Sequence, residues 1–191
     1  MSKAKFFKNF LKKPSEVGAI LPSSRRLAEM MVSDIGLQNA EAVVELGPGT
    51  GVFTDVILEK INKNTLFFTI ERNEDIYNHF TENYPDVKCY NRCASEILDI
   101  MKIEKVEKLD AVISGLPWAS FPSEAQHSIL NAVVEALKDG GSFVTFAYLQ
   151  GFLLPAAHRF KKLLKSKFSD VQLSKVVWRN APPAFVYRCR K

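Results

Sequence analysis

The chain has 191 residues, of which 47% are hydrophobic and 25% are charged, the ordinary balance of a globular protein. This length is enough for one domain with a substantial core, and the composition excludes a disordered chain, a collagen-like repeat and a disulfide miniprotein. The formal net charge is +5, but residues 1–13 carry five lysines and no acidic residue, so the rest of the chain balances at 21 basic and 21 acidic residues. A whole-surface nucleic-acid binder usually spreads its basic residues over the fold instead.

The cysteines and the chain start indicate a reducing compartment. Cys89, Cys93 and Cys189 fit no zinc or redox spacing and are predicted to be reduced thiols. The lysine-rich start is not followed by the sustained apolar stretch of a signal peptide. We therefore expect a cytoplasmic protein without a metal site.

The first predicted element is an amphipathic helix near the start of the chain. At about 100° per residue, one arc of this helix carries Ala4, Phe6, Phe7, Phe10 and Leu11. The opposite side carries Lys5, Lys8, Lys12 and Lys13, and Lys3 lies among the apolar residues. A second helix is predicted over Ser24–Ser33, with Pro22 and Ser23 as its start signal. Residues 1–34 therefore form a helical lead-in.

From residue 35 to residue 191, short apolar runs alternate with segments of helical period, which predicts one α/β domain. The predicted strands are Ala42–Leu46, Leu66–Glu71, Val87–Asn91, Leu109–Ser114, Ser142–Tyr148, Val171–Trp178 and Ala184–Cys189. The predicted helices are Val52–Ile61, Glu74–Asn83, Ser95–Met101, Ser123–Leu137 and Ala156–Phe168. The early strands are nearly continuous apolar runs, typical of a parallel sheet covered on both faces, and the last two strands suggest an antiparallel pair. The prediction is a Rossmann-like, doubly wound, mostly parallel sheet of seven strands.

The most informative stretch is Val43-Val44-Glu45-Leu46-Gly47-Pro48-Gly49-Thr50-Gly51, in which a predicted strand runs into three alternate glycines before a predicted helix. Glycines let the backbone turn sharply and approach a ligand closely. Twenty residues beyond Gly51, the second predicted strand ends at Glu71. In a doubly wound sheet such an acid lies beside the glycine loop and accepts hydrogen bonds from both ribose hydroxyls.

Two nucleotide ligands fit this pattern. A dinucleotide needs a third glycine where the chain has Val52, and its pyrophosphate sits poorly beside the carboxylate of Glu45. S-adenosylmethionine has no phosphate, and a nearby acid favours its ammonium group. The electrostatics therefore predict S-adenosylmethionine as the cofactor.

On these residues the sequence resembles the class I S-adenosylmethionine-dependent methyltransferases over residues 40–191. The resemblance implies that the three glycines wrap the methionine part of the cofactor and that Glu71 holds the ribose. After the third strand this family usually has an Asp that contacts adenine, and Cys93 or its neighbour replaces it here, which implies a contact through the backbone. The expected cofactor-binding residues are Glu45, Gly47, Gly49, Gly51, Glu71, Arg72, Cys93, Ala94 and Ser114.

After the fourth predicted strand the chain reads Ser114-Gly115-Leu116-Pro117-Trp118. Methyltransferases that act on the adenine amine place Asn or Asp first in such a segment, followed by Pro and an aromatic residue. Leu116-Pro117-Trp118 looks like the ribosomal RNA adenine dimethylases, but Ser114 stands where their Asn would be. This substitution is an argument against adenine as the substrate.

Three further segments resemble the bacterial phospholipid N-methyltransferases, which convert phosphatidylethanolamine stepwise toward phosphatidylcholine. They are residues 13–24, residues 114–122 with Phe121-Pro122 at the end, and residues 178–188 with Pro182-Pro183 in the middle. This resemblance covers the whole chain. It implies that the substrate is the amine headgroup of phosphatidylethanolamine and its methylated derivatives.

Methyl transfer from a sulfonium is an in-line displacement, so the amine must arrive neutral, and catalysis then comes from positioning and desolvation. The Ser114 carbonyl or the Tyr148 hydroxyl is expected to orient the amine hydrogens. The rings of Trp118 and Tyr148 are expected to stabilise the cationic product by cation–π contact, and Arg179 is expected to bind the lipid phosphate. The expected catalytic residues are Ser114, Leu116, Pro117, Trp118 and Tyr148.

A lipid headgroup must be reached at a membrane, and an amphipathic helix with phenylalanines opposite lysines suits an anionic interface. Each lysine near such a surface adds about 1 kcal/mol. The expected membrane-binding residues are Lys3, Lys5, Phe6, Phe7, Lys8, Phe10, Leu11, Lys12 and Lys13. We expect a monomer at the inner face of the membrane, with no nucleic-acid partner.

Two alternatives remain open from the sequence. One is an RNA adenine N6-methyltransferase, favoured by Leu116-Pro117-Trp118, although such enzymes usually add a C-terminal helical domain that this chain is expected to lack. The other is a catalytically silent membrane-binding protein that kept the cofactor fold, favoured by the unusual Cys93 segment.

Overall fold

The computed structural model describes residues 23–153 and 155–191. The predicted amphipathic helix, and with it the whole expected membrane-binding set from Lys3 to Lys13, lies outside the described residues. The described part begins with helix α3 (Arg25–Val32), whose N-cap is Ser24. The Ser24 side chain accepts a hydrogen bond from the Leu27 amide, which places the helix start one residue later than Ser23.

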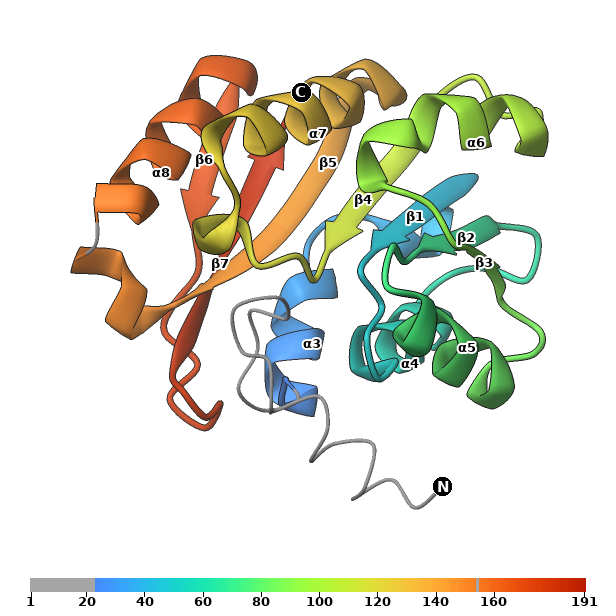
Figure 1. Ribbon diagram of the computed structural model, residues 1–191, viewed down its shortest axis with the longest axis horizontal. Helices are drawn as coiled ribbons and strands as arrows, with labels where there is room; N and C mark the ends of the chain where they lie inside the picture. The colour runs from blue at the N-terminus through green and yellow to red at the C-terminus, as the bar shows by residue number, and fades with distance from the viewer. Residues whose placement is uncertain (1–22, 154) are drawn as a thin grey trace.

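Seven strands form one sheet in the order β3-β2-β1-β4-β5-β7-β6 (Figure 1). The strands are β1 (Ala42–Leu46), β2 (Leu66–Ile70), β3 (Lys88–Tyr90), β4 (Leu109–Ser114), β5 (Leu137–Tyr148), β6 (Asp170–Leu173) and β7 (Ala184–Arg190). The first five pair in parallel, whereas β7 runs antiparallel to both β5 and β6. The predicted doubly wound, mostly parallel sheet with an antiparallel end is therefore confirmed.

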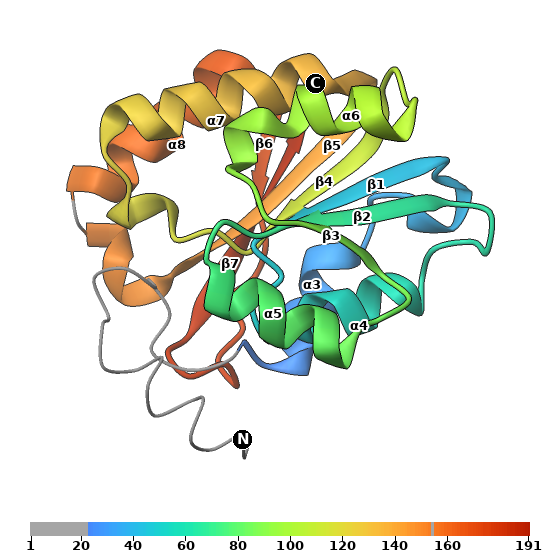
Figure 2. The same ribbon diagram turned by 45° about the vertical axis from the view of Figure 1, so that its right-hand side comes forward.

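Helices cover both faces of the sheet, which explains why β1 is buried along its whole length. On one face lie α3, α4 (Val52–Leu58) and α5 (Glu74–Asn83), and on the other lie α6 (Ile97–Glu104), α7 (Ser123–Ala136) and α8 (Pro155–Lys167) (Figure 2). Each layer of helices has its own hydrophobic cluster against the sheet. Short 3₁₀ turns complete the chain at Leu37–Asn39, Ala94–Glu96, Trp118–Ser120 and Leu149–Leu153.

The predicted strand Val171–Trp178 is shorter in the structure, where β6 ends at Leu173. The Ser174 hydroxyl accepts a hydrogen bond from the Val186 amide at 2.9 Å. In a continuing strand this amide would donate to a backbone carbonyl of β6 instead. After β6, the Ser174 amide still donates to the Val186 carbonyl at 2.9 Å, and Val177 forms an isolated bridge with Ala184. Residues 174–183 therefore form a connection that projects beyond the sheet.

Among the helices of residues 23–153 and 155–191, none is both long and apolar enough to cross a bilayer.

Candidate cofactor and substrate site

The candidate site lies where the parallel strands end, because the glycine loop, Glu71 and the segment after β4 all meet at that edge. Gly47, directly after β1, donates its amide hydrogen to the Ile70 carbonyl of β2 at 2.9 Å. On the other side, Gly115 donates to the Leu46 carbonyl at 2.8 Å. Backbone hydrogen bonds thus bring together three segments that are far apart in the sequence, as expected at the switch point of a doubly wound sheet.

In the glycine loop, the requirement for glycine is clearest at Gly51, which is the N-cap of α4 and has a φ of 85°. A Cβ atom there would lie 2.2 Å from the hydroxyl of Tyr84. This hydroxyl donates to the carboxylate of Asp55 at 2.8 Å and lies 3.2 Å from the Gly51 carbonyl. At Gly49, by contrast, a Cβ would meet nothing within 4 Å, so one side of the loop is open to a ligand.

Glu45 is a completely buried acid and the last residue but one of β1, just before the loop. Its Oε2 accepts a hydrogen bond from the Thr54 hydroxyl at 2.6 Å, whereas its Oε1 is buried and has no hydrogen-bond partner among the described residues. Burial raises the pKa of Glu45 to about 8, and the nearby Asp55 and Glu71 add to this shift. An unpartnered buried carboxylate oxygen costs free energy unless a donor or cation reaches it, so this atom is suited to a positively charged ligand.

Glu71 lies directly after β2, as predicted. Its Oε1 accepts a hydrogen bond from the Asn73 amide at 2.8 Å, and the Arg72 amide also donates to this carboxyl group, so two backbone donors orient it. Partial burial raises the pKa of Glu71. The Asn91 side chain donates to the Glu71 carbonyl at 2.9 Å and ties the end of β3 to this acid. The residues expected from the sequence did not include Asn91, although its position directly after β3 indicates that it lies at the edge of the sheet that carries the site.

The remaining expected cofactor residues differ in their surroundings. Arg72 is exposed, its carbonyl accepts from the Asn91 side chain at 3.2 Å, and its amide donates to the Glu71 carboxyl group. Cys93 donates its amide hydrogen to the Glu96 carboxylate at 3.0 Å, and its sulfur accepts from the Ser95 hydroxyl. Ala94 is buried in the core. The Cys93 amide is therefore already engaged, which removes the most direct backbone donor for an adenine contact.

Ser114 is fully buried and holds the loop that follows β4. Its hydroxyl accepts from the Trp118 indole at 3.0 Å and lies 3.3 Å from the Leu116 amide. Its carbonyl accepts from the Thr145 hydroxyl at 3.1 Å. Both polar groups of Ser114 thus bond within the protein, and the residue positions the loop instead of pointing to a ligand.

The placement of Trp118 corrects an expectation from the sequence. The ring is 2% exposed and stacks on Phe160 at a centroid distance of 4.9 Å, with the edge of Phe143 also against it. Because its faces pack in the core, the ring does not present a surface for a cationic headgroup. Leu116 packs beside the glycine loop, 2.8 Å from the position of a Cβ on Gly47, and Pro117 precedes the 3₁₀ turn that carries Trp118 inward.

Tyr148 ends β5 at the same edge of the sheet. Its hydroxyl is buried and has no hydrogen-bond partner among the described residues, and burial raises its pKa. A row of aromatic rings links it to the loops: Tyr148 packs edge-on against Phe146 at 5.4 Å, and Phe146 packs against Phe53 at 5.7 Å. The Phe53 ring in turn approaches Gly115. Of the two groups expected to orient an amine, the Tyr148 hydroxyl is the one that the fold leaves available.

Arg179 lies apart from these groups, in the connection between β6 and β7, where it is exposed beside α3. The described residues contain no cluster of three or more His, Cys, Asp or Glu side chains suited to a metal ion.

Comparison with known proteins gives two informative sequence relatives and one solved structure of similar fold, while no protein-family model matches the chain. An ornithine lipid N-methyltransferase from Singulisphaera acidiphila is 29% identical over 188 residues, covering 97% of this chain and 94% of the relative. Ribosomal RNA small subunit methyltransferase A from Ureaplasma parvum is 27% identical over 128 residues, which cover 60% of this chain and only 44% of that protein. The crystal structure of an O-methyltransferase from Bacillus cereus, solved with S-adenosylhomocysteine, superposes with a TM-score of 0.72 at 13% identity over 100% of this chain and 93% of that one.

Proposed function

We propose that the chain is a class I S-adenosylmethionine-dependent methyltransferase and that it N-methylates the amine headgroup of a membrane lipid. The observation that carries the proposal is the relationship to an ornithine lipid N-methyltransferase over nearly the full length of both chains. Phosphatidylethanolamine, expected from the sequence, and ornithine lipid, named for the relative, both present a primary amine. They are the two substrates to compare.

The described residues fit S-adenosylmethionine, which supplies a methyl group on a positively charged sulfur. The open side of the loop at Gly49 leaves room for the methionine part. The unpartnered Oε1 of Glu45 favours a cation. The carboxyl group of Glu71, which the Asn73 amide orients, has further acceptor capacity for the ribose hydroxyls. Because Cys93 is engaged with Glu96, we propose that apolar contacts hold the adenine at the ends of β3 and β4.

Tyr148 is the residue that we propose to orient the substrate amine. Its buried hydroxyl stays protonated because burial raises its pKa, so the oxygen accepts a hydrogen bond from an amine N–H without removing a proton. A neutral amine held in this way keeps its lone pair free for the methyl carbon, and the apolar ring row of Phe53 and Phe146 keeps water away. The ring of Tyr148 also offers a face to the cationic product.

Association with the membrane surface is proposed through the N-terminal segment. Its phenylalanines and lysines match the composition of a helix that lies in an anionic interface. If the enzyme binds at the bilayer surface, its substrate lipids need not leave the bilayer. The attraction between the lysines and an anionic membrane weakens as salt screens their charges.

A lipid is favoured over RNA as the substrate. The RNA-modifying relative matches only part of this chain, and Ser114, where the RNA enzymes are expected to carry Asn, turns its hydroxyl to Trp118. A buried Trp118 also leaves no ring at that position for a base to stack on.

The test is methyl transfer with labelled S-adenosylmethionine and the full chain. Anionic vesicles containing phosphatidylethanolamine, anionic vesicles containing ornithine lipid, and small-subunit ribosomal RNA are offered in parallel. We expect label in at least one amine lipid and none in RNA. Label in RNA with none in either lipid would overturn the proposal.

A further inference from the structure

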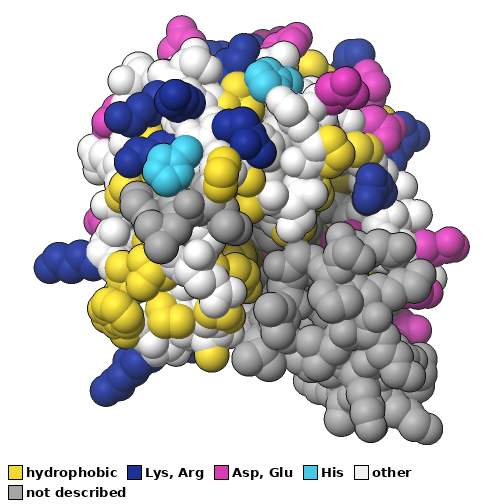
Figure 3. Space-filling view, turned by 60° about the vertical axis from the view of Figure 1, so that its left-hand side comes forward, with side chains coloured by type: hydrophobic (Ala, Val, Ile, Leu, Met, Phe, Trp, Pro, Cys, Tyr) yellow, Lys and Arg dark blue, Asp and Glu magenta, His cyan; other side chains and the backbone are white. Residues whose placement is uncertain are grey.

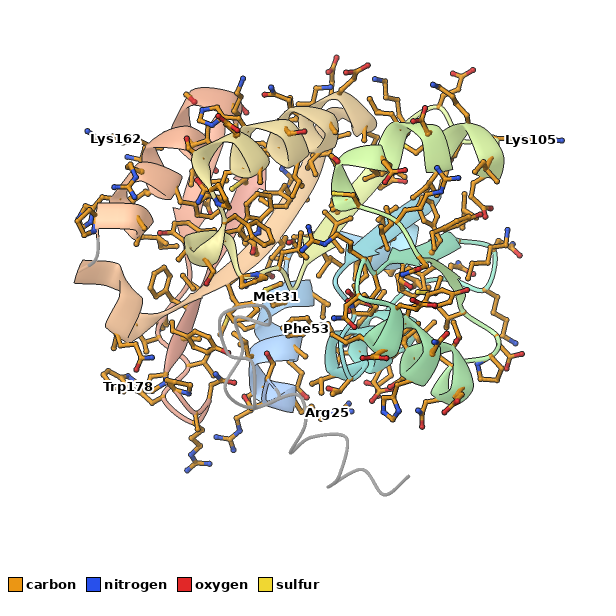
Figure 4. All side chains as sticks on the ribbon, in the orientation of Figure 1. Arg25, Met31, Phe53, Lys105, Lys162 and Trp178 are labelled. Atoms are coloured by element: carbon orange, nitrogen blue, oxygen red, sulfur yellow. The ribbon has the colours of Figure 1, made fainter. Side chains whose placement is uncertain are left out.

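The connection between β6 and β7 carries a large apolar side chain that is turned toward solvent. Trp178 is 70% exposed, whereas the other tryptophan, Trp118, is 2% exposed. In Figure 4, Trp178 lies at the outer margin of the molecule, well apart from the core residues Met31 and Phe53. An exposed tryptophan of this degree is uncommon in a globular domain unless its polar N–H and its apolar ring meet two different surroundings.

This exposure does not come from a loose loop. The Asn180 side chain accepts from the Ser24 amide at 2.8 Å and donates to the Pro182 carbonyl at 2.7 Å. The Val177 amide donates to the Ala184 carbonyl at 2.7 Å. The connection is therefore tied both to α3 and to β7, and Trp178 is held outward by a fixed backbone.

Basic side chains surround the ring. Arg179 and Arg26 of α3 line a groove together with Trp178, and Lys175 is exposed three residues before the ring. The acid in this groove, Glu29, is paired with Arg25. Within residues 23–153 and 155–191, no ion pair involves any of these three cations, whereas the adjacent Arg25 is paired with Glu29 and Glu59. Figure 3 shows one face of the molecule on which hydrophobic side chains gather, with Lys or Arg side chains at the margin.

The connection also lies at the edge of the sheet that carries the candidate site. Ala184, the first residue of β7, pairs with Tyr148, the last residue of β5. A flat partner that touches the connection would therefore be close to the proposed amine-binding hydroxyl.

We propose that the 174–183 connection, with Arg26 of α3, is a membrane-docking surface. In this surface Trp178 enters the headgroup region of an anionic bilayer, and Arg26, Lys175 and Arg179 bind lipid phosphates. Tryptophan prefers this interfacial depth, and clustered cations are drawn to an anionic leaflet. The proposal rests on the proposed lipid substrate but adds a second contact, one that is independent of residues 1–13. Together, the N-terminal segment and this surface would orient the candidate site toward the lipid.

The two tryptophans make the proposal directly measurable in the full chain. Indole fluorescence is recorded with vesicles of phosphatidylcholine alone and of phosphatidylcholine with phosphatidylglycerol, the latter also with brominated acyl chains. Trp178→Phe leaves Trp118 as the only indole, so the difference between the two proteins is the signal of Trp178. We expect that difference signal to shift to shorter wavelength with anionic vesicles and to be quenched by the bromines, while the Trp118 signal stays constant.

Charge reversal provides the second readout. Arg179→Glu is expected to weaken binding to anionic vesicles at least fivefold in co-sedimentation. The matched variant Lys63→Glu changes a lysine that is also exposed, in the loop before β2 at the opposite edge of the sheet, and is expected to bind like the wild type. Equal effects of the two variants would overturn the proposal.

The outcomes separate the docking surface from the proposed function. Vesicle binding and lipid methylation without any change at Trp178 would overturn the docking surface and leave the function standing. A shift at Trp178 without lipid methylation would overturn the proposed function and leave the docking surface standing. A shift that depends on protein concentration in the absence of vesicles would show that a second copy covers this face, and would likewise overturn the proposal.

Discussion

The hydroxyl of Thr54, in the first turns of α4, donates to the carboxylate of Glu45 at 2.6 Å and leaves the other carboxylate oxygen buried without a partner among the described residues. This contact joins the end of β1 to the helix that follows the glycine loop. It engages one carboxylate oxygen within the protein, whereas the second is left for a ligand. Glu45 is thus both a structural group and the most strongly perturbed acid that faces the loop.

Glu45 makes cofactor affinity depend on pH. Its pKa is about 8 in the free protein, and a bound cation favours the ionised form, so binding below pH 8 must release a proton. Affinity for S-adenosylmethionine is expected to rise between pH 6 and pH 8, by at most about tenfold per pH unit, and then to level off. Calorimetry of the wild type and Glu45→Gln checks this, since the variant is expected to lose the slope. Equal slopes in both proteins would contradict the assignment.

The same group lowers the stability of the unliganded protein as pH rises. Its pKa is raised in the folded state, so the folded protein binds the extra proton between about pH 4.5 and pH 8, and its free energy of unfolding falls across that window. Glu45→Gln is expected to remove this fall. Denaturant unfolding at pH 5.5 and pH 8.5 measures it, and a wild-type free energy that does not fall across this range would show that the carboxyl is ionised in both conditions.

Gly51→Ala tests the packing of the glycine loop. A Cβ there meets the Tyr84 ring at a residue with positive φ, so a loss of roughly 1–3 kcal/mol in the free energy of unfolding is expected. Gly49→Ala is the matched control, since its Cβ meets no protein atom. This control is expected to lose less stability but to bind cofactor more weakly. Guanidinium unfolding and calorimetry distinguish the two, and the reverse order would refute the description of the loop.

Tyr148→Phe tests the proposed amine contact. Removing an unpartnered buried hydroxyl costs no stability, so the variant is expected to unfold like the wild type and to bind cofactor equally well. Its kcat for lipid methylation is expected to fall by about 10-fold or more because the amine loses its orienting acceptor. Tyr90→Phe, which removes a hydroxyl that bonds Glu104 of α6, serves as the control. An unchanged kcat for Tyr148→Phe would remove this residue from the mechanism.

Glu71 and the N-terminal segment are expected to separate cofactor binding from membrane binding. Glu71→Gln keeps an acceptor for the Asn73 amide but loses the charge toward the ribose, so cofactor affinity is expected to fall about tenfold. Deleting residues 1–13 is expected to spare cofactor affinity and to reduce vesicle binding strongly. Calorimetry and vesicle sedimentation on both proteins check the division, which fails if the two changes affect cofactor affinity alike.

Local patterns of residues determined much of this protein. β1 and β4 have the predicted bounds, and α5 extends over Glu74–Asn83 as the 3.6-residue period indicates. The pairing of the glycine loop with Glu71 was also predictable, because parallel strands separated by a helix must end at the same edge of the sheet. These features depend on short-range periodicity and backbone geometry, which a sequence carries directly.

Only the tertiary structure decided which side chains face the site. Trp118 was expected to meet the substrate, but Phe143 and Phe160, from two later elements, enclose its ring. Tyr84 presses on Gly51 from 33 residues away, and nothing in either local sequence indicates that contact. The unpartnered hydroxyl of Tyr148 and the outward position of Trp178 depend likewise on which long-range neighbours are within reach. A residue's type sets what it can bond or bury, but the packing of distant elements determines whether a partner is present.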